Sequence, residues 1–464
     1  MIETKDGRLQ SLIGKAIRQL TSHDNNRQLV SMTKKIKSQD PLHFFLAAKQ
    51  LNMDRTFWTS STEDFFLVGV GSVYEIVADD NRYEQTKSKW YALLEQAEIH
   101  NPYRVPGTGL IALGGMSFDP KKATSHLWEK YKHSLFRIPQ FVLTKYKAQD
   151  YLTININIHK DDDPLQIAHQ LTKQEQLLLQ SSQFTSEVQA HIIDSEEIAL
   201  NQWKDVVQQA IDELQGGQMQ KIVLARELRL KLSQQANIAH ILKQLLDTQP
   251  NSYVFAFEQG DDCFVGATPE RLVKLEKNHL LSTGLAGTAP RGETEKEDRM
   301  IGNRLLHDEK NLQEHAYVVQ MIRDGIEKYC TDIDIPDEPV LYPLKNLQHL
   351  YTPVQATLKP GASIFDIIAR LHPTPALGGT PTEEALRFIR DYELLDRGWY
   401  GAPIGWLDSN DHGEFAVAIR SGLIQGDEAS LFAGCGILKD SDVETEYEET
   451  NIKFLPMLTV LGGL

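Results

Sequence analysis

The order of apolar segments along the 464-residue chain most restricts how it can fold. Segments with the two-residue alternation and β-branched residues of strands come in groups, and helical segments form other groups. A doubly wound fold would instead alternate strand and helix. We therefore predict an α+β fold of stacked, mostly antiparallel sheets covered by helices. Early strands are predicted at 64–72, 109–118, 140–146 and 151–158, and residues 164–190 as a helix followed by a connector.

The chain divides near residue 195, and the patterns after it are sharper. Apolar residues recur at helical spacing over 203–214, and Gly216-Gly217 ends that helix. Strands are predicted at 221–230, 253–258, 262–268, 415–424 and 430–437, of which the second and third form a hairpin. One long helix is predicted from a Thr294 cap to about residue 329, and Ser441 is predicted to cap the last helix.

Charge and composition exclude several classes of partner. The formal charge of −16 argues against nucleic acid, because phosphate binding needs a basic surface. An anionic metabolite would need local cations or a metal to overcome that charge. Cys263, Cys330 and Cys435 form neither a metal-type spacing nor a disulfide framework, and no apolar run has the length of a membrane span or of a signal core. We expect a cytosolic protein without nucleic-acid or membrane partners.

Two positions suggest acid/base chemistry. Lys221 shares one face of its predicted strand with Val223 and Ala225, so its amine is placed to point inward, and burial favours the neutral, basic form of an amine. Glu270 follows the Thr268-Pro269 turn at the end of an apolar strand, where partial loss of water would raise its pKa and keep it protonated near neutrality. The alternatives are an edge-strand lysine that blunts pairing and a solvated turn glutamate.

The last helix carries a stripe of charge. Glu446, Glu449 and Lys453 fall on one face, which suits a hard cation together with an anionic ligand. Glu314, at the edge of the apolar face of its helix, can supply a further carboxylate. The alternatives are a solvated helix face with i,i+4 pairing between Glu449 and Lys453, and a boundary glutamate that pairs with His315 or a lysine.

Several polar residues lie within apolar stretches. His349, Tyr400 and Arg420 are of this kind. A buried arginine needs an anionic partner, which is either a carboxylate ligand or an internal acidic residue. The glycine-rich segment 284–292 lacks the pattern of a phosphate loop but can bring Thr288 and backbone N–H groups to a ligand.

Nine motifs carry a resemblance to a known family. In chain order they are KIVLAR, GATPERL, GLAGT, QEHAYVV, HPTPALGGTP, RGWYGAPIGW, EFAVAIRSGLI, AGCGI and EYEETNIK. They closely resemble those of the chorismate-utilising enzymes, and within them the isochorismate synthases of the menaquinone pathway. The match covers about residues 200–460, and the earlier part matches only loosely around 114–119. The resemblance implies the fold of the anthranilate synthase large subunit, with a variable region 1–195 packed on a catalytic domain 196–464.

The resemblance also implies a role for each residue. Lys221 would be the general base that activates water for attack at C2 of chorismate, and Glu270 the general acid that protonates the departing C4 hydroxyl. Mg²⁺ would be bound directly by Glu314 and Glu449, with Glu446 close by through water. The residues that would hold the substrate are Thr288, His349, Tyr400, Arg420, the backbone of Gly434, and Lys453.

Other outcomes remain open at this point. The amine-transferring members of the family lack a lysine where Lys221 stands, so water is the expected nucleophile. A salicylate synthase, which makes isochorismate and then eliminates pyruvate, would use the same residues. A non-catalytic chorismate-binding module would lack a base, an acid or a metal carboxylate, and all are present here. We expect a monomer or a weak homodimer.

Overall fold

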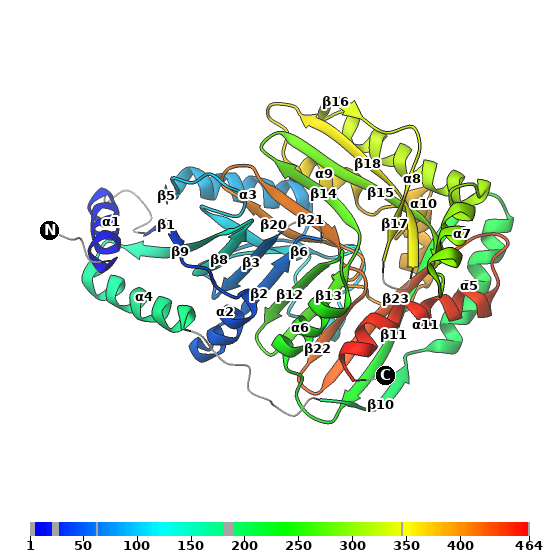
Figure 1. The fold of residues 1–464 in the computed structure, drawn as a ribbon, viewed down its shortest axis with the longest axis horizontal. Coiled ribbons are helices and arrows are strands. Elements are labelled where there is room, and N and C mark those ends of the chain that lie inside the picture. The colour runs from blue at the N-terminus through cyan, green and yellow to red at the C-terminus, as the bar shows by residue number, and fades with distance from the viewer. Residues whose placement is uncertain (1–4, 21–26, 62–63, 181–189, 345–346, 463–464) are drawn as a thin grey trace.

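The computed structural model describes residues 5–20, 27–61, 64–180, 190–344 and 347–462. Two large sheets stack on each other, and helices cover their outer faces (Figure 1). This arrangement confirms the predicted α+β fold. Within the described strands, β1 and β5 pair in parallel, whereas neighbours such as β11–β23 and β15–β18 are antiparallel. The predicted hairpin at 253–268 is confirmed as β12 and β13.

The first sheet has thirteen strands. In spatial order they are β10 (Ile192–Glu197), β11 (Lys221–Leu232), β23 (Glu428–Ile437), β22 (Ser421–Gln425), β13 (Asp262–Thr268), β12 (Tyr253–Gln259), β2 (Arg55–Thr59), β3 (Phe65–Val70), β8 (Phe141–Tyr146), β9 (Gln149–His159), β1 (Arg27–Ile36) and β5 (Glu98–His100), with β19 (Gly379–Thr380) beside β11.

The second sheet has ten strands. In spatial order they are β16 (Cys330–Asp334), β18 (Leu347–Leu358), β15 (His279–Pro290), β14 (Arg271–Glu276), β21 (Gly413–Val417), β20 (Pro403–Asp408), β6 (Ile111–Met116), β7 (Ser134–Ile138) and β4 (Tyr74–Ala78), with β17 (Val340–Pro343) beside β18.

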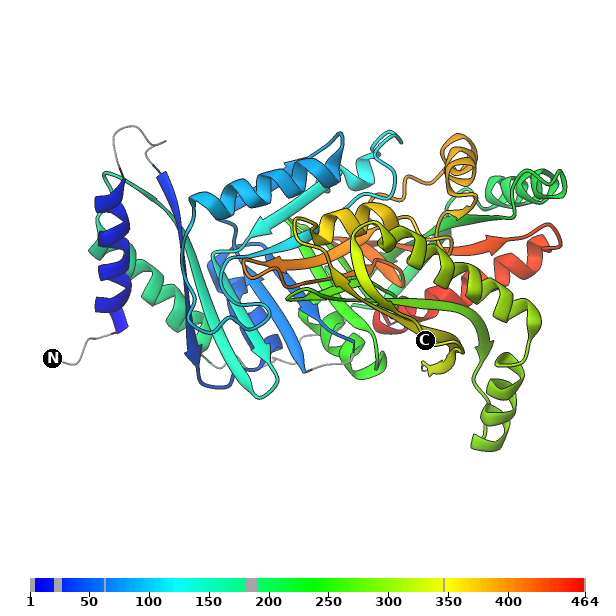
Figure 2. The same cartoon turned by 90° about the horizontal axis from the view of Figure 1, so that it is seen from above.

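The helices of the described chain lie on the outer faces of these sheets and at the two ends of the molecule. They are α1 (Lys5–Gln19), α2 (Pro41–Ala47), α3 (Arg82–Gln96), α4 (Pro164–Leu179), α5 (Leu200–Gln215), α6 (Ile238–Thr248), α7 (Glu295–Leu305), α8 (Glu309–Glu327), α9 (Ile364–Leu371), α10 (Thr382–Tyr392) and α11 (Val443–Val460). Helices α1 and α11 lie toward opposite ends of the long axis (Figure 2). None of the helices in the described ranges has a stretch long and apolar enough to cross a membrane.

An aromatic layer joins the two sheets. It is built from buried side chains of both, such as Phe264 on β13 and Trp406 on β20. Phe65 stacks against Trp406 at 5.0 Å between ring centroids, and Phe264 contacts Trp399 at 6.4 Å. Apolar residues of α2, α6 and α11 pack on the outer face of the first sheet, and those of α3, α8 and α9 on that of the second. The large apolar area removed from water drives the stacking of the sheets.

The helix predicted at 203–214 is confirmed as α5, whose buried face is the predicted one. Two other predictions about helices are wrong. The helix predicted from Thr294 to about 329 is two helices, because the Asp308 side chain accepts a 2.8 Å hydrogen bond from the Asn311 N–H and starts α8 there. The last helix is capped by Asp442 in place of Ser441. Helix α4 confirms the helical part of 164–190, and most of the predicted connector lies outside the described residues.

The single strand predicted over 415–424 is also wrong. The segment forms β21 in the second sheet and β22 in the first, and the chain passes between the sheets at 418–420. Arg420 takes a left-handed backbone conformation there, with φ of 53°. Both strands are buried, so the apolar pattern runs through the break without a change of period.

Strands from both sides of residue 195 pair within each sheet. Strand β2 pairs with β12 in the first sheet, and β6 pairs with β20 in the second. The two regions therefore share hydrogen-bonded sheets as well as side-chain packing. The division into 1–195 and 196–464 stays a prediction.

We predict that Phe264→Ala lowers the free energy of unfolding by about 3–5 kcal/mol, because it leaves a cavity in the aromatic layer. Urea denaturation monitored by circular dichroism measures the change. Leu165→Ala is the control, since Leu165 is 59% exposed and its truncation should change stability by less than about 0.5 kcal/mol. Equal effects of the two substitutions would show that the aromatic layer does not stabilise the stacking of the sheets.

Candidate active site

Two crossings between the sheets lie side by side and carry two of the predicted site residues. Glu270 follows β13 where the chain passes from the first sheet to the second, and Arg420 precedes β22 where it passes back. The Val417 N–H donates to the Glu270 carbonyl at 3.0 Å, and the Ala267 N–H donates to the Arg420 carbonyl at 3.1 Å. The backbone thus fixes the acidic and the basic residue next to each other.

Lys221 lies at the start of β11 and reaches across to the second sheet. Its Nζ forms an ion pair with Oε1 of Glu314 at 2.6 Å, and Glu314 belongs to α8, which packs on β15 and β18. The lysine side chain is 17% exposed, so the prediction that it points inward is confirmed. Gly436 lies under the side chain, since a Cβ there would come within 2.5 Å of the Lys221 Cε. A larger residue at 436 would displace the amine.

The Glu270 carboxyl is half-buried in this pocket. Loss of hydration raises its pKa to about 7. A 3.4 Å hydrogen bond from the Thr374 hydroxyl and the charges of Lys221, Arg420 and Lys453 act in the opposite direction. The carboxyl therefore holds its proton over part of the neutral range, in the direction that the sequence predicts for a general acid.

Arg420 brings a cation to the same place. Its guanidinium has no hydrogen-bond or ion-pair partner within the described residues, which is unusual for a side chain held among protein atoms. Burial lowers the pKa of Arg420, while Tyr400, Glu449 and Glu270 oppose this change. The internal ion pair considered from the sequence is absent from the described chain, and an unpartnered guanidinium fits an anionic ligand.

The paired strands β15 and β18 place Thr288 opposite His349. The Thr288 hydroxyl and the His349 Nδ1 are 2.9 Å apart. Burial and the neighbouring charges of Arg420 and Lys453 lower the pKa of His349 to about 4, so its ring is neutral at physiological pH. A neutral imidazole beside a hydroxyl offers one donor and one acceptor to a ligand without adding charge.

Tyr400, Gly434 and Lys453 form the third side of the site. The Lys453 ammonium donates to the Gly434 carbonyl at 2.8 Å. A Cβ at Gly434 would lie 3.4 Å from the Tyr400 hydroxyl, so that hydroxyl approaches the backbone of β23 closely. Tyr400 is buried, and the loss of water raises its pKa. The structure therefore brings these three groups together.

Helix α11 contributes the carboxylates. Glu449 pairs with Lys453 at 2.5 Å, so the i,i+4 pair considered from the sequence exists. The Glu446 Oε1 accepts a 2.6 Å hydrogen bond from the Ser441 hydroxyl, whereas its Oε2 is buried without a partner. Burial, followed by the charge of Glu449, raises the pKa of Glu446, although the Ser441 bond acts against that change. An orphaned carboxylate oxygen is one a cation or water can satisfy.

The carboxylates near Lys221 and Lys453 offer oxygen atoms of the kind that magnesium binds, but they do not form a complete metal site. Across the described ranges, no group of three or more His, Cys, Asp or Glu side chains is arranged to hold a metal. Magnesium usually takes one or two protein carboxylates and completes its shell with water and ligand oxygens. Lys221 and Lys453 now neutralise Glu314 and Glu449, as a cation would. Glu314, Glu449 and the unpartnered Oε2 of Glu446 are oxygen donors of the kind that magnesium takes, one or two at a time.

Contacts and charges link all eleven predicted site residues into one cluster, and the structure adds two that the sequence analysis left out. Thr374 contacts Glu270, and Gly436 makes room for Lys221. Both lie inside motifs quoted from the sequence, HPTPALGGTP and AGCGI. The motifs therefore pointed to these segments. The local sequence pattern does not show which residue of a motif contacts Glu270 or Lys221.

Comparison with known proteins identifies the family of the chain. The sequence profile of the family described as chorismate binding enzyme matches residues 15–462. The chain belongs to the chorismate binding enzyme family. It is 43% identical to isochorismate synthase MenF of Bacillus subtilis (strain 168) over 448 residues, which cover 95% of this chain and 94% of the relative.

Solved structures of the family share the fold. The structure of MenF, the menaquinone-specific isochorismate synthase from Escherichia coli, aligns with a TM-score of 0.80 at 22% identity and covers 98% of this chain and 99% of that one. Anthranilate synthase component I from Streptococcus pneumoniae TIGR4 aligns with a TM-score of 0.69 at 20% identity, covering 87% and 93% of the two chains. The predicted anthranilate-synthase-like architecture is confirmed.

The raised pKa of Glu270 predicts a dependence of stability on pH. Its ordinary value is 4.5 and its folded value about 7, so the folded protein binds this proton more tightly than the unfolded chain. That stabilising contribution is complete below the lower value and is lost as pH rises through the higher one. We expect the stability of the parent, relative to Glu270→Gln, to fall as pH rises from about 4.5 to about 7. Thermal denaturation at several pH values measures it, and a rise over this window would contradict the assignment.

Proposed function

We propose that the protein is an isochorismate synthase that converts chorismate to isochorismate for menaquinone biosynthesis with the help of Mg²⁺. The observation that carries the proposal is one cluster in which Lys221 of β11 and Glu270, whose pKa burial raises to about 7, lie beside an Arg420 guanidinium without a partner within the described residues. The 43% identity to isochorismate synthase MenF of Bacillus subtilis over nearly the whole chain supports the same conclusion.

Each reacting group has a defined proton to move. Lys221, once its amine is neutral, takes a proton from water as the water oxygen bonds to C2 of chorismate. The ring double bonds shift, and the C4–O bond breaks. Glu270 donates its proton to the departing hydroxyl, which leaves as water because hydroxide is a poor leaving group. The net reaction moves the hydroxyl position without oxidation or reduction.

The remaining residues bind and orient the substrate. Arg420 and Lys453 offer cations to its two carboxylates, and neutral His349 with Thr288 offers hydrogen bonds at no cost in charge. Burial of Tyr400 keeps its hydroxyl protonated and able to donate. Holding the ring against both the base and the acid supplies much of the rate by orientation.

Magnesium would be held by Glu314 and Glu449, with Glu446 near it. When bound it would neutralise and anchor a substrate carboxylate in a protein of formal charge −16. A cation on Glu314 would also compete with the Lys221 ammonium for the same carboxylate. We further propose that the enzyme works in the cytosol as a monomer or weak homodimer, and its three buried free cysteines suit a reducing compartment.

We predict that the purified protein with Mg²⁺ turns chorismate into isochorismate, with neither salicylate nor pyruvate formed. Chromatography of the products, with a coupled assay for pyruvate, measures this. Salicylate with stoichiometric pyruvate would identify a salicylate synthase, and binding of chorismate without any product would identify a non-catalytic module. Either result rejects the proposed function.

Lys221→Ala and Glu270→Gln test the two roles in the same assay. Lys221→Ala should abolish turnover because no base remains for the water. Glu270→Gln keeps the shape of the side chain but cannot deliver a proton, so kcat should fall by about 10²–10⁴-fold while chorismate affinity changes little. Full turnover by either variant would show that its residue lacks the proposed role.

We predict that Glu449→Gln raises the Mg²⁺ concentration needed for half-maximal activity by at least about tenfold, because a neutral amide is a weaker ligand for a hard cation. Glu444→Gln is the matched control, since Glu444 lies on the same helix but is 69% exposed and pairs with Lys204. Titration of activity with Mg²⁺ measures both. Identical metal titrations for the two variants would remove Glu449 from the metal site.

A further inference from the structure

A buried ion pair lies behind the proposed active site. Arg397 and Glu393 are separated by one helical turn in sequence, and their side chains are only 2% and 1% exposed. The Arg397 Nε and Nη2 donate to the two Glu393 carboxylate oxygens, each at 2.7 Å. No role for this pair follows from the reaction itself, because neither side chain is among the groups that would meet the substrate.

The pair ties three active-site segments together. Arg397 donates at 2.8 Å to the Val223 carbonyl and at 2.8 Å to the Leu377 carbonyl. Glu393 accepts a 2.7 Å hydrogen bond from the Ala225 N–H. Val223 and Ala225 follow the base on β11, and Leu377 lies in the loop that carries Thr374.

The segment that bears the pair also carries Tyr400. The Tyr400 N–H donates to the Arg397 carbonyl at 2.8 Å. Through Thr374, the loop held by Arg397 contacts the carboxyl of Glu270. The pair is therefore connected to Lys221, Glu270 and Tyr400 through a few hydrogen bonds and short stretches of backbone.

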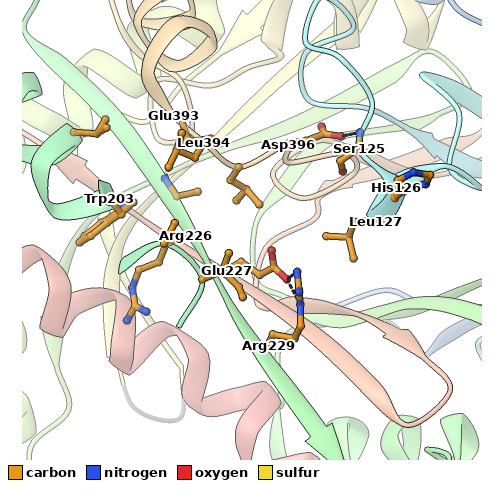
Figure 3. A pocket seen from close by; sticks show the side chains of 15 residues that line it. Ser125, His126, Leu127, Trp203, Arg226, Glu227, Arg229, Glu393, Leu394 and Asp396 are labelled. Carbon is orange, nitrogen blue, oxygen red and sulfur yellow. Dashed lines mark hydrogen bonds and ion pairs between the residues drawn. The ribbon is translucent and has the colours of Figure 1, made fainter. Parts of the chain in front are cut away.

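The segment 393–397 lies between the protein interior and a cavity. On the inner side, the Arg397 guanidinium lies 4.3 Å from the ring centre of Phe118, and the Lys122 ammonium donates to the Glu393 carbonyl. On the outer side is a cavity of about 310 Å³. Figure 3 shows Glu393, Leu394 and Asp396 along its wall, opposite Arg226 and Glu227.

Leu394 is 64% exposed and adds little packing, while Asp396 accepts hydrogen bonds from the Ser125 N–H at 2.7 Å and the Trp128 Nε1–H at 3.0 Å. Directional hydrogen bonds therefore hold this segment, and those of the ion pair are the ones that reach β11 and the Thr374 loop. Arginine suits this task because its planar fork bonds a carboxylate and backbone carbonyls at once, which a lysine cannot copy.

We propose that Glu393 and Arg397 form a positioning pair that sets the distances among Lys221, Glu270 and Tyr400. The proposal rests on the proposed function of these residues. A buried ion pair is a weak source of stability, because desolvation offsets its attraction, but its bonds define geometry. A misplacement of about 1 Å between reacting groups can cost about 10²-fold in rate.

The test compares Arg397→Lys with Arg55→Lys. Arg55 makes a matched bidentate pair with Glu258, at 2.8 and 2.5 Å, and a further bond to the Phe45 carbonyl, but it lies on β2. Both variants lose a guanidinium fork and keep the charge. Arg397→Lys should lower kcat by about 10–100-fold with chorismate affinity changed less than about threefold. Arg55→Lys should lower the melting temperature similarly and leave kcat within about twofold.

A second measurement is independent of turnover. The ¹³C carboxyl resonance of Glu270, assigned with Glu270→Gln, should shift in Arg397→Lys and stay in place in Arg55→Lys. If the parent makes no isochorismate while this resonance shifts only in Arg397→Lys, the proposed function fails and the positioning pair stands. If the parent is active and Arg397→Lys matches Arg55→Lys in kcat and in the resonance, the positioning pair is overturned.

Should Arg397→Lys fail to fold, Glu393→Gln gives the same decision. Its amide oxygen still accepts from the Ala225 N–H, while its amide nitrogen can no longer accept from Arg397. It should lower kcat and shift the Glu270 resonance in the same way. Parent-like values of both would overturn the proposal.

Discussion

The stacking of two sheets through one aromatic layer is the constraint on which the rest of this structure depends. Because the layer holds the sheets face to face, the chain must pass between them, and it does so at two adjacent places. Glu270 lies on one passage and Arg420 on the other, with backbone hydrogen bonds between them. Residues at such passages cannot pair fully in either sheet, so their side chains are free to face the pocket.

The same geometry gathers cations in one place on a chain with a formal charge of −16. Lys221, Arg420 and Lys453 come from three different elements and converge beside Glu270. The carboxylates of Glu314 and Glu449 form ion pairs with two of these cations, Lys221 and Lys453. Arg420 has no such partner in the described chain, which leaves it ready for a ligand carboxylate.

Glu270 and Lys221 have different surroundings. The pKa of Glu270 rises to about 7 because water is lost around it, although three cations oppose that rise. The Lys221 ammonium, in contrast, lies 2.6 Å from a carboxylate oxygen of Glu314. The two groups proposed as acid and base thus lie close together in different surroundings. The N-terminal region takes part in this arrangement, since its strands continue both sheets and Phe118 supports Arg397.

Local pattern in the sequence determined the α+β class, most strands, helix α5 and the residue types of the site, because periodicity and turn residues are properties of neighbouring positions. It misjudged 415–424 and 294–329, where a buried chain changes sheet or restarts a helix without changing its apolar period. Only the tertiary structure decided that Lys221 meets Glu314, that Arg420 stays unpaired within the described residues, and that Thr374 and Gly436 shape the pocket. Those contacts join residues far apart in sequence, so no local pattern contains them.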